Sequence, residues 1–138
     1  MAAFNKINSF VEAVAEKLHN LGADQLVYAL TAAANAPVAT NTVVANLTQI
    51  SYTNLSTRNI TTSTSSQSSG TYKLVLADLV LTASGGSVAA FRYLVIYNDT
   101  ATNDELVGWY DYGSDLTLAN GETLTIDHDG TNGVLQIA

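Results

Sequence analysis

The sequence predicts a mainly β protein, an antiparallel β-sandwich that is jelly-roll-like and is preceded by one N-terminal amphipathic α-helix. Three observations support this. Apolar residues recur at helical spacing only at the start of the chain, the pattern then changes to the alternation of strands, and short turn signals follow at regular intervals. The 138 residues are the size of one domain. We therefore divide the chain into a helix over 1–22 and a β-sandwich domain over 23–138.

The expected helix is defined by an apolar stripe with steps of three and four residues. The stripe consists of Phe4, Ile7, Val11, Val14, Leu18 and Leu21, and Gly22 supplies a stop signal. His19 would lie in the last turn, where a cation is favoured by the helix dipole. So short a helix is marginal in water by itself. The stripe must therefore pack on its own domain or on a neighbouring chain, and both interpretations stay open.

The segments after the helix alternate as strands do. The first expected strand is 24–30, followed by an Ala-rich connection over 31–40 and by a loop with a short segment over 41–50. The Thr/Ser-rich stretch 58–65 suits an edge strand that is wet on one side, and 68–70 is a turn. Two further strands are expected at 72–76 and 79–82, and a loop at 84–87.

The clearest strands lie in the last third of the chain. Residues 91–97 are apolar on both faces, which indicates a central strand, and 106–112 would pair with it across the polar loop 98–105. Segments 116–118 and 122–126 are joined at Asn120-Gly121, a strong hairpin signal. A last strand is expected at 134–137.

Composition excludes several classes of function. The chain has no cysteine, so disulfides, thiolate zinc sites and cysteine nucleophiles are absent. Residues 1–77 carry four basic and three acidic side chains, whereas 78–138 carry one basic and nine acidic ones, which gives −7 overall. A nucleic-acid partner is therefore not expected. No apolar stretch is long enough to span a membrane, and without a signal peptide we expect synthesis in the host cytoplasm.

The residues that could carry chemistry do not form a catalytic set. His128 stands between Asp127 and Asp129, and strand alternation points it away from both. A hydrolase would require Asp127, His128 or Asp111, but no nucleophile motif accompanies them, so we expect no enzyme. The oxygen-rich segment 127–133 resembles a calcium loop but lacks its spacing and its closing glutamate. We interpret it as a turn and expect no metal or cofactor.

An aromatic cluster allows a second interpretation. Trp109, Tyr110 and Tyr112 stand beside Asp111 and Asp115, and flat aromatic rings can stack on sugars. Strand alternation places Tyr110 and Tyr112 on one face and Trp109 with Asp111 on the other. One of these faces is expected to be core, because large aromatic rings supply much of the buried area of a small sandwich.

Segments along nearly the whole chain resemble small virion proteins of tailed bacteriophages. The likeness is carried by 1–6 with the helix, 30–31, 36–42, 69–78, 91–100, 107–113, 120–126 and 132–135, which include APVATNT, SGTYKLVLAD, FRYLVIYNDT and VGWYDYG. The resemblance implies a capsid decoration (cement) protein, or a tail-associated component. It implies no activity and supplies no catalytic residues.

The resemblance also implies the partners. A decoration protein would bind the outside of the major capsid protein lattice and would associate with itself as a homodimer or homotrimer, with no membrane or nucleic acid as partner. Many weak contacts repeated by symmetry would hold it on the virion. We place the stripe residues Phe4, Ile7, Val11, Val14 and Leu18 at this interface. The alternative is a carbohydrate-binding β-module on a tail or fibre.

Overall fold

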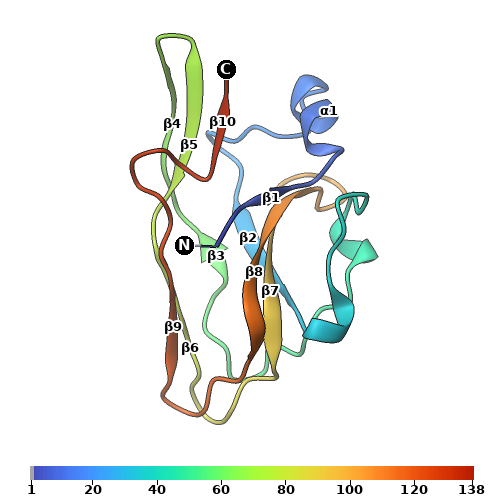
Figure 1. The fold of residues 1–138 in the computed structure, drawn as a ribbon, viewed down its shortest axis with the longest axis vertical. Coiled ribbons are helices and arrows are strands. Elements are labelled where there is room, and N and C mark those ends of the chain that lie inside the picture. Colours follow the sequence, from blue (N-terminus) through green and yellow to red (C-terminus); the bar gives the residue numbers. More distant parts are fainter. Residues whose placement is uncertain (1) are drawn as a thin grey trace.

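The computed structural model describes residues 2–138, which form two layers of antiparallel β-strands with one short helix at one end (Figure 1). The first layer is a five-stranded sheet in the order β1-β8-β7-β2-β3, and the second contains β10-β5-β4 and the pair β6-β9. The mainly β, antiparallel fold class is confirmed, while the jelly-roll connectivity is not. The elements are β1 Asn5–Lys6, α1 Phe10–Ala15, β2 Leu26–Thr31, β3 Asn59–Ile60, β4 Thr62–Ser68, β5 Thr71–Leu76, β6 Leu79–Thr82, β7 Phe91–Asn98, β8 Leu106–Leu116, β9 Thr123–Ile126 and β10 Leu135–Ile137, with 3-10 turns at Ala33–Asn35 and Val44–Asn46.

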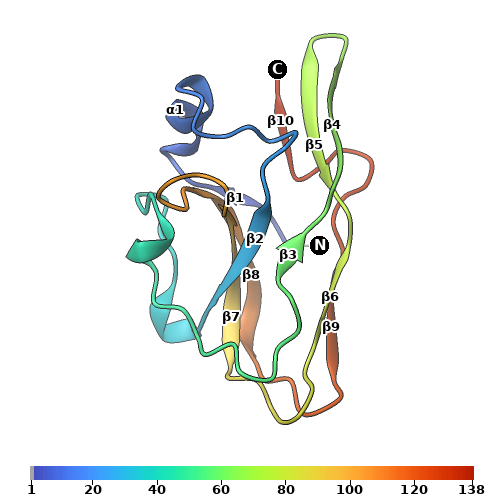
Figure 2. The same ribbon diagram turned by 180° about the vertical axis from the view of Figure 1, so that it is seen from behind.

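Strand β7 is central, as its apolar sequence predicts. It pairs with β2 on one side and with β8 on the other, and Leu94 to Asn98 are buried. The second layer covers one face of this sheet. The segment between β2 and β3, with Val44, Leu47 and Tyr52 packed on the core, lies on the other (Figures 1 and 2). The strand is apolar on both faces because both faces are covered.

The Thr/Ser-rich stretch forms two strands instead of one. β3 pairs with β2 in the first layer, and after Thr61 the chain enters β4, which pairs with β5 in the second layer. The turn between β4 and β5 is Ser69-Gly70, and both residues have positive φ, as a two-residue type I′ turn requires. The edge position expected for this stretch is confirmed, because β4 has a hydrogen-bonded neighbour on one side only.

The hairpin expected at Asn120-Gly121 is wrong in its pairing. β9 pairs with β6, whereas Leu116 ends β8 and pairs with Phe91. Asn120-Gly121 still lies in a turn, where Glu122 N donates to Ala119 O (2.9 Å), but this turn leads from one layer to the other. The turn signal is local, and it does not determine which strand becomes the neighbour.

The helix expected over 1–22 is also wrong in its extent. Residues 5–6 form a strand on β8, Ile7 N donates to Val107 O (3.1 Å), and Asn8 N donates to Ala39 O (2.9 Å). The helix itself has only six residues. Pairing with β8 gives residues 5–6 long-range backbone hydrogen bonds in place of the local ones of a helix. The apolar residues spaced three and four apart therefore lie partly next to β1, partly in the helix and partly in a loop.

The N-terminal segment belongs to the common core. Ile7, Phe10 and Leu21 are buried in the same cluster as the strand residues of both layers. The Phe4 ring packs on Tyr110, with ring centroids 5.3 Å apart, and lies directly over Gly108. A Cβ at Gly108 would collide with that ring and would stand 2.6 Å from Asn5 O. β8 therefore requires glycine at this position so that the N-terminal segment can lie against it.

No helix within residues 2–138 is long and apolar enough to cross a membrane.

Candidate interaction surface

The helix ends earlier than its sequence suggests because Lys17 adopts the left-handed conformation, with φ 67°. Leu18 N donates to Ala13 O (2.8 Å), and Lys17 N donates to Val14 O (3.2 Å). These two bonds form a Schellman motif, in which glycine usually occupies the place that Lys17 has here. The motif turns the chain away at Lys17, so that the expected stop at Gly22 plays no part in ending the helix.

Early termination divides the five proposed interface residues into two groups. Ile7 is fully buried, and Phe4 is partly buried against Gly108 and Tyr110, so both contribute to the interior of the domain. Val11 is 55% exposed, Leu18 is 46% exposed, and Val14 is partly buried. The helix buries Phe10 and Ala13 instead, one residue out of step with the expected stripe.

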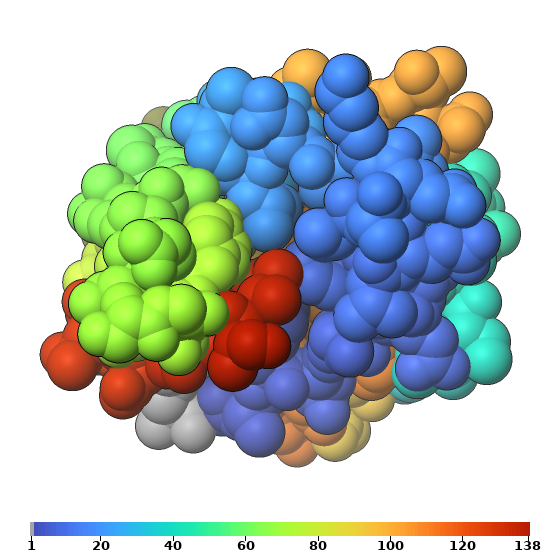
Figure 3. All heavy atoms as spheres, turned by 90° about the horizontal axis from the view of Figure 1, so that it is seen from above, coloured from blue at the N-terminus to red at the C-terminus, as the bar shows by residue number. Residues whose placement is uncertain are grey.

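An apolar surface remains at the α1 end of the molecule, and we call it the α1 surface. It consists of Val11 and Val14 from the helix and of Leu135 and Ile137 from β10, with Ile137 41% exposed. Two hollows of about 350 and 320 Å³ adjoin it, and Val14 and Ile137 line both. Viewed from above, the end of β10 lies between the helix region and the β4–β5 hairpin (Figure 3). Leu18 lies outside both hollows.

His19 is buried at this end of the molecule and is not a solvent-facing cation at a helix terminus, as the sequence had suggested. Its Nδ1 accepts a hydrogen bond from Asn98 Nδ2 (3.0 Å), while Nε2 has no partner among residues 2–138. Burial lowers the pKa of His19, although Glu105 and Asp24 act in the opposite direction. The ring is therefore neutral near pH 7, and its proton is on Nε2.

Asn98 connects the segment after the helix to the β7–β8 loop. Its Nδ2 donates to Asp24 Oδ2 (2.6 Å) as well as to His19, and its Oδ1 accepts from the backbone N–H groups of Thr100 (3.0 Å) and Ala101 (3.1 Å). Asn98 is fully buried. Sequence reasoning treated this residue only as the start of a polar loop, because nothing local indicates that its amide has partners 74 and 79 residues away.

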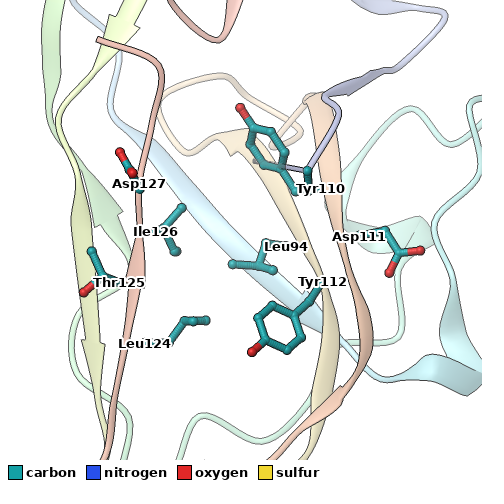
Figure 4. Close-up of a pocket in the computed structure, with 9 residues that line it drawn as sticks. Leu94, Tyr110, Asp111, Tyr112, Leu124, Thr125, Ile126 and Asp127 are labelled. Carbon is teal, nitrogen blue, oxygen red and sulfur yellow. The ribbon is translucent and has the colours of Figure 1, made fainter.

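A third hollow lies between the layers, where β8 faces β9. It has a volume of about 290 Å³, and its apolar lining comes from Leu94, Tyr110, Leu124 and Ile126. Tyr112, 48% exposed, points into the same space (Figure 4), as strand alternation predicts. Burial, with the charge of Asp129, raises the pKa of Tyr110 to about 12. Thr125 and Asp127 also line this hollow, but the side chain of Thr125 points away from Leu94 and Tyr112 (Figure 4).

Asp111 also lines this hollow, but its side chain points away from it (Figure 4). Its two carboxylate oxygens accept from Arg92 Nε (2.8 Å) and Nη2 (3.0 Å). This hydrogen bonding, with a further bond from Gly113 N, holds the pKa of Asp111 below its usual range. The aspartate thus forms an ion pair with Arg92 on the other side of β8.

His128 holds the two layers together. Its Nε2 lies 2.7 Å from the Tyr28 hydroxyl on β2, and its Nδ1 donates to Ala77 O (2.9 Å) at the corner between β5 and β6. The side chain is 4% exposed, and burial lowers its pKa. Its ring bonds lead to Tyr28 and Ala77, so the structure does not assemble Asp127, His128 and Asp111 into one site.

The oxygen-rich segment 127–133 is a turn stabilised by Asp129. Asp129 accepts from Thr131 N (2.8 Å), Asn132 N (2.8 Å) and Asn132 Nδ2 (3.0 Å). These bonds hold its pKa below the usual value. Within residues 2–138 no group of three or more histidine, aspartate or glutamate side chains is arranged to hold a metal ion. The interpretation of this segment as a turn agrees with the hydrogen bonds.

Comparison with protein-family models, with curated proteins and with solved structures finds no significant match to this chain.

Proposed function

We propose that this protein is a virion structural protein of a tailed bacteriophage, a decoration protein that binds the outside of the major capsid protein lattice and stabilises the head. The observation that carries the proposal is the α1 surface. Large apolar side chains on α1 and β10 stand open to solvent at one end, and two hollows lie beside them. Exposed apolar patches of this kind are typical of protein–protein contact sites.

The α1 surface is apolar in composition, since it is built from Val11, Val14, Leu135 and Ile137. Lys6 is the charged residue that lines the hollow beside Val11. Copies of this protein that associate with one another would each make this contact on a neighbouring capsid subunit. Sites that are weak individually would then give a high overall affinity for the capsid.

The experiment is co-sedimentation of the full chain with purified capsids that lack it. The double change Val11→Ser and Ile137→Ser removes two exposed apolar side chains from the α1 surface. Each is worth about 1.5–3 kcal/mol when fully buried, so we expect at least about tenfold weaker binding. The matched control is Val80→Ser on β6, an equally exposed valine (49%) at the opposite end of the molecule (Figure 1).

Unchanged binding of the double variant would contradict the proposed surface, as would an equal loss in the Val80 variant. Leu18→Ser is a useful third variant, because Leu18 is exposed beside the helix but lies outside both hollows. A loss of binding there as well would extend the contact around the end of α1.

A second candidate function is carbohydrate binding by a tail- or fibre-associated module. The observation that favours it is the hollow between β8 and β9, which is lined by Tyr110, Asp127 and the half-exposed Tyr112, whose ring points into it (Figure 4). A glycan array distinguishes the two functions. A sugar that binds the wild type and not Tyr112→Ala supports the module, whereas a decoration protein should co-sediment with heads and bind no glycan.

A further inference from the structure

β4 is the longest edge strand in the described chain, residues 2–138. It contains seven residues, whereas the edge strands β1, β3, β6, β9 and β10 contain two to four. Proteins usually protect such edges with proline, charged side chains, short strands, β-bulges or a covering element. β4 reads TSTSSQS, so it has neither proline nor charge, and its register shift is confined to its start, between Thr62 and Thr64. Five of its seven residues are exposed: Ser63, Thr64, Ser66, Gln67 and Ser68.

The pairing pattern shows which backbone groups of β4 face outward. Ser69-Gly70 is a two-residue turn, so Ser68 and Thr71 form the hydrogen-bonded pair that closes it. Hydrogen-bonded and non-hydrogen-bonded pairs alternate along an antiparallel ladder. The N–H and C=O groups of Ser65 and Gln67 therefore point away from β5, where the sheet has no further strand.

This edge is also uncharged in a chain with a net charge of −7. No acidic or basic residue occurs from Asn59 to Tyr72, and the segment includes both β4 and its turn. The hairpin projects beyond the rest of the second layer (Figure 1). Two copies can therefore approach through β4 without bringing like charges together, although their acidic C-terminal halves repel.

We infer that β4 pairs antiparallel with β4 of a second copy of this chain, which joins the two β10-β5-β4 sheets across a twofold axis. An identical strand can always pair with itself antiparallel through such an axis, because the contact is isologous. The Ser and Thr side chains suit this pairing, since hydroxyl groups can hydrogen-bond across strands. Each copy has one β4, so the association closes as a dimer.

The positive charge nearest to this interface is compatible with the pairing. Lys73 on β5 stands opposite Ser66, and its Nζ donates to Thr131 O (3.3 Å). In the dimer, the two Lys73 side chains are separated by three strand spacings, about 14 Å. This exceeds the Debye length at physiological salt, about 8 Å, so their repulsion is largely screened.

The dimer deepens the proposed function and rests on its self-association, but it is tested without capsids. A weak dimer in solution suits a protein held by repeated contacts, because a lattice brings neighbouring copies together at high effective concentration. Failure of self-association and failure of capsid binding are measured separately and can therefore be told apart.

The test is sedimentation equilibrium of the full chain with Ser66→Lys, Ser66→Glu and their equimolar mixture. Ser66 is exposed near the middle of β4. It lies opposite its own copy when Ser65 pairs with Gln67 of the second copy, and diagonally two residues from it when Ser65 or Gln67 pairs with its own counterpart. We expect the wild type to dimerise with a Kd of roughly 0.01–1 mM, as small interfaces do. Each variant alone should associate about threefold to fivefold more weakly, and the effect should grow at low salt.

The mixture is the decisive arm. Lysine in one copy and glutamate in the other form an attractive cross-strand pair, so the mixture should regain the wild-type affinity. Lys73 cannot explain a loss shared by both variants, because it repels one substitution and attracts the other. Val80→Lys on β6 is the matched control for added charge and should leave the affinity unchanged.

Three results would overturn the inference. A wild-type chain that stays monomeric at millimolar concentration would contradict the proposed dimer. Variants with wild-type affinity would place self-association elsewhere, and a mixture that does not recover would exclude pairing through Ser66.

Discussion

His19 and His128 are buried to nearly the same extent, 6% and 4% exposed, yet they hold different junctions in different ways. His128 links the two layers, with Tyr28 at one ring nitrogen and Ala77 at the other. His19 connects the segment after the helix to the β7–β8 loop through Asn98, and its Nε2 has no partner among the described residues.

The comparison shows that burial alone does not measure what a polar side chain contributes to stability. A buried polar group with all its partners stabilises a specific arrangement, whereas one without a partner keeps part of its desolvation cost. Both histidines are neutral in the folded state because burial lowers their pKa values. The difference lies in the hydrogen bonds that substitution would remove.

The largest effect is expected for His128→Leu, which should lower the free energy of unfolding by about 2–4 kcal/mol. The change leaves the fully buried Tyr28 hydroxyl and the Ala77 carbonyl without their partner. Chemical denaturation followed by circular dichroism measures it. Adding Tyr28→Phe removes one of the two orphaned groups, so the double variant should lose less than the two single changes together. Strict additivity would show that the contact contributes nothing.

Acid should destabilise the protein between pH 7 and pH 5, before the carboxylates titrate. Both histidine pKa values lie below the ordinary value of 6.5 in the folded chain, so the unfolded chain takes up protons first. This stabilisation is fully present above pH 6.5 and is lost as the pH falls toward the folded pKa values. Asp111 and Asp129, with lowered pKa values, act in the same direction but below about pH 4.

Denaturation curves at a series of pH values measure this dependence. Each histidine substitution should flatten it in part, and a stability that stays constant from pH 7 to pH 5 in the wild type would contradict the neutral, buried state of both rings.

The smallest effect is expected for His19→Leu, about 1 kcal/mol of destabilisation. Asn98 loses one acceptor but keeps Asp24, and the unpartnered Nε2–H disappears with the ring. The same denaturation experiment gives the value. If His19→Leu lowered the free energy of unfolding as much as His128→Leu does, the missing hydrogen bond at Nε2 of His19 would have no effect on stability. The proposed difference between the two histidines would then be wrong.

The sequence predicted those features that depend on neighbours within a few residues. The alternation in β5, β6, β7 and β8 is local, and so is the Ser69-Gly70 turn, whose residues adopt the positive φ that such turns need. The polar edge strand was predicted for a similar reason, since hydroxyl-rich residues suit a strand with one wet side.

The candidate surface could be predicted only in part. Val11 and Val14 were identified from their spacing, but Leu135 and Ile137 come from the other end of the chain. Leu18 lies outside the surface, and Phe4 and Ile7 pack in or against the core. Lys17 ends the helix in a conformation that favours glycine, so no sequence signal marked that boundary. The hydrogen-bond partners of the His19 and His128 rings lie 51 to 100 residues away, beyond the reach of any local pattern.

By itself, the sequence determined a mainly β, antiparallel domain with a short N-terminal helix, because side-chain alternation and turn chemistry act over a few residues. Only the tertiary structure decided which strands became neighbours, where the helix stopped and which apolar residues stayed outside. Those outcomes depend on long-range contacts. For example, β1 pairs with β8 beside Gly108, and β9 pairs with β6 although residues 116–118 are nearer in the sequence. Backbone pairing and close packing at these sites outweigh the local periodicity, because a buried backbone group must find a partner wherever the fold offers one.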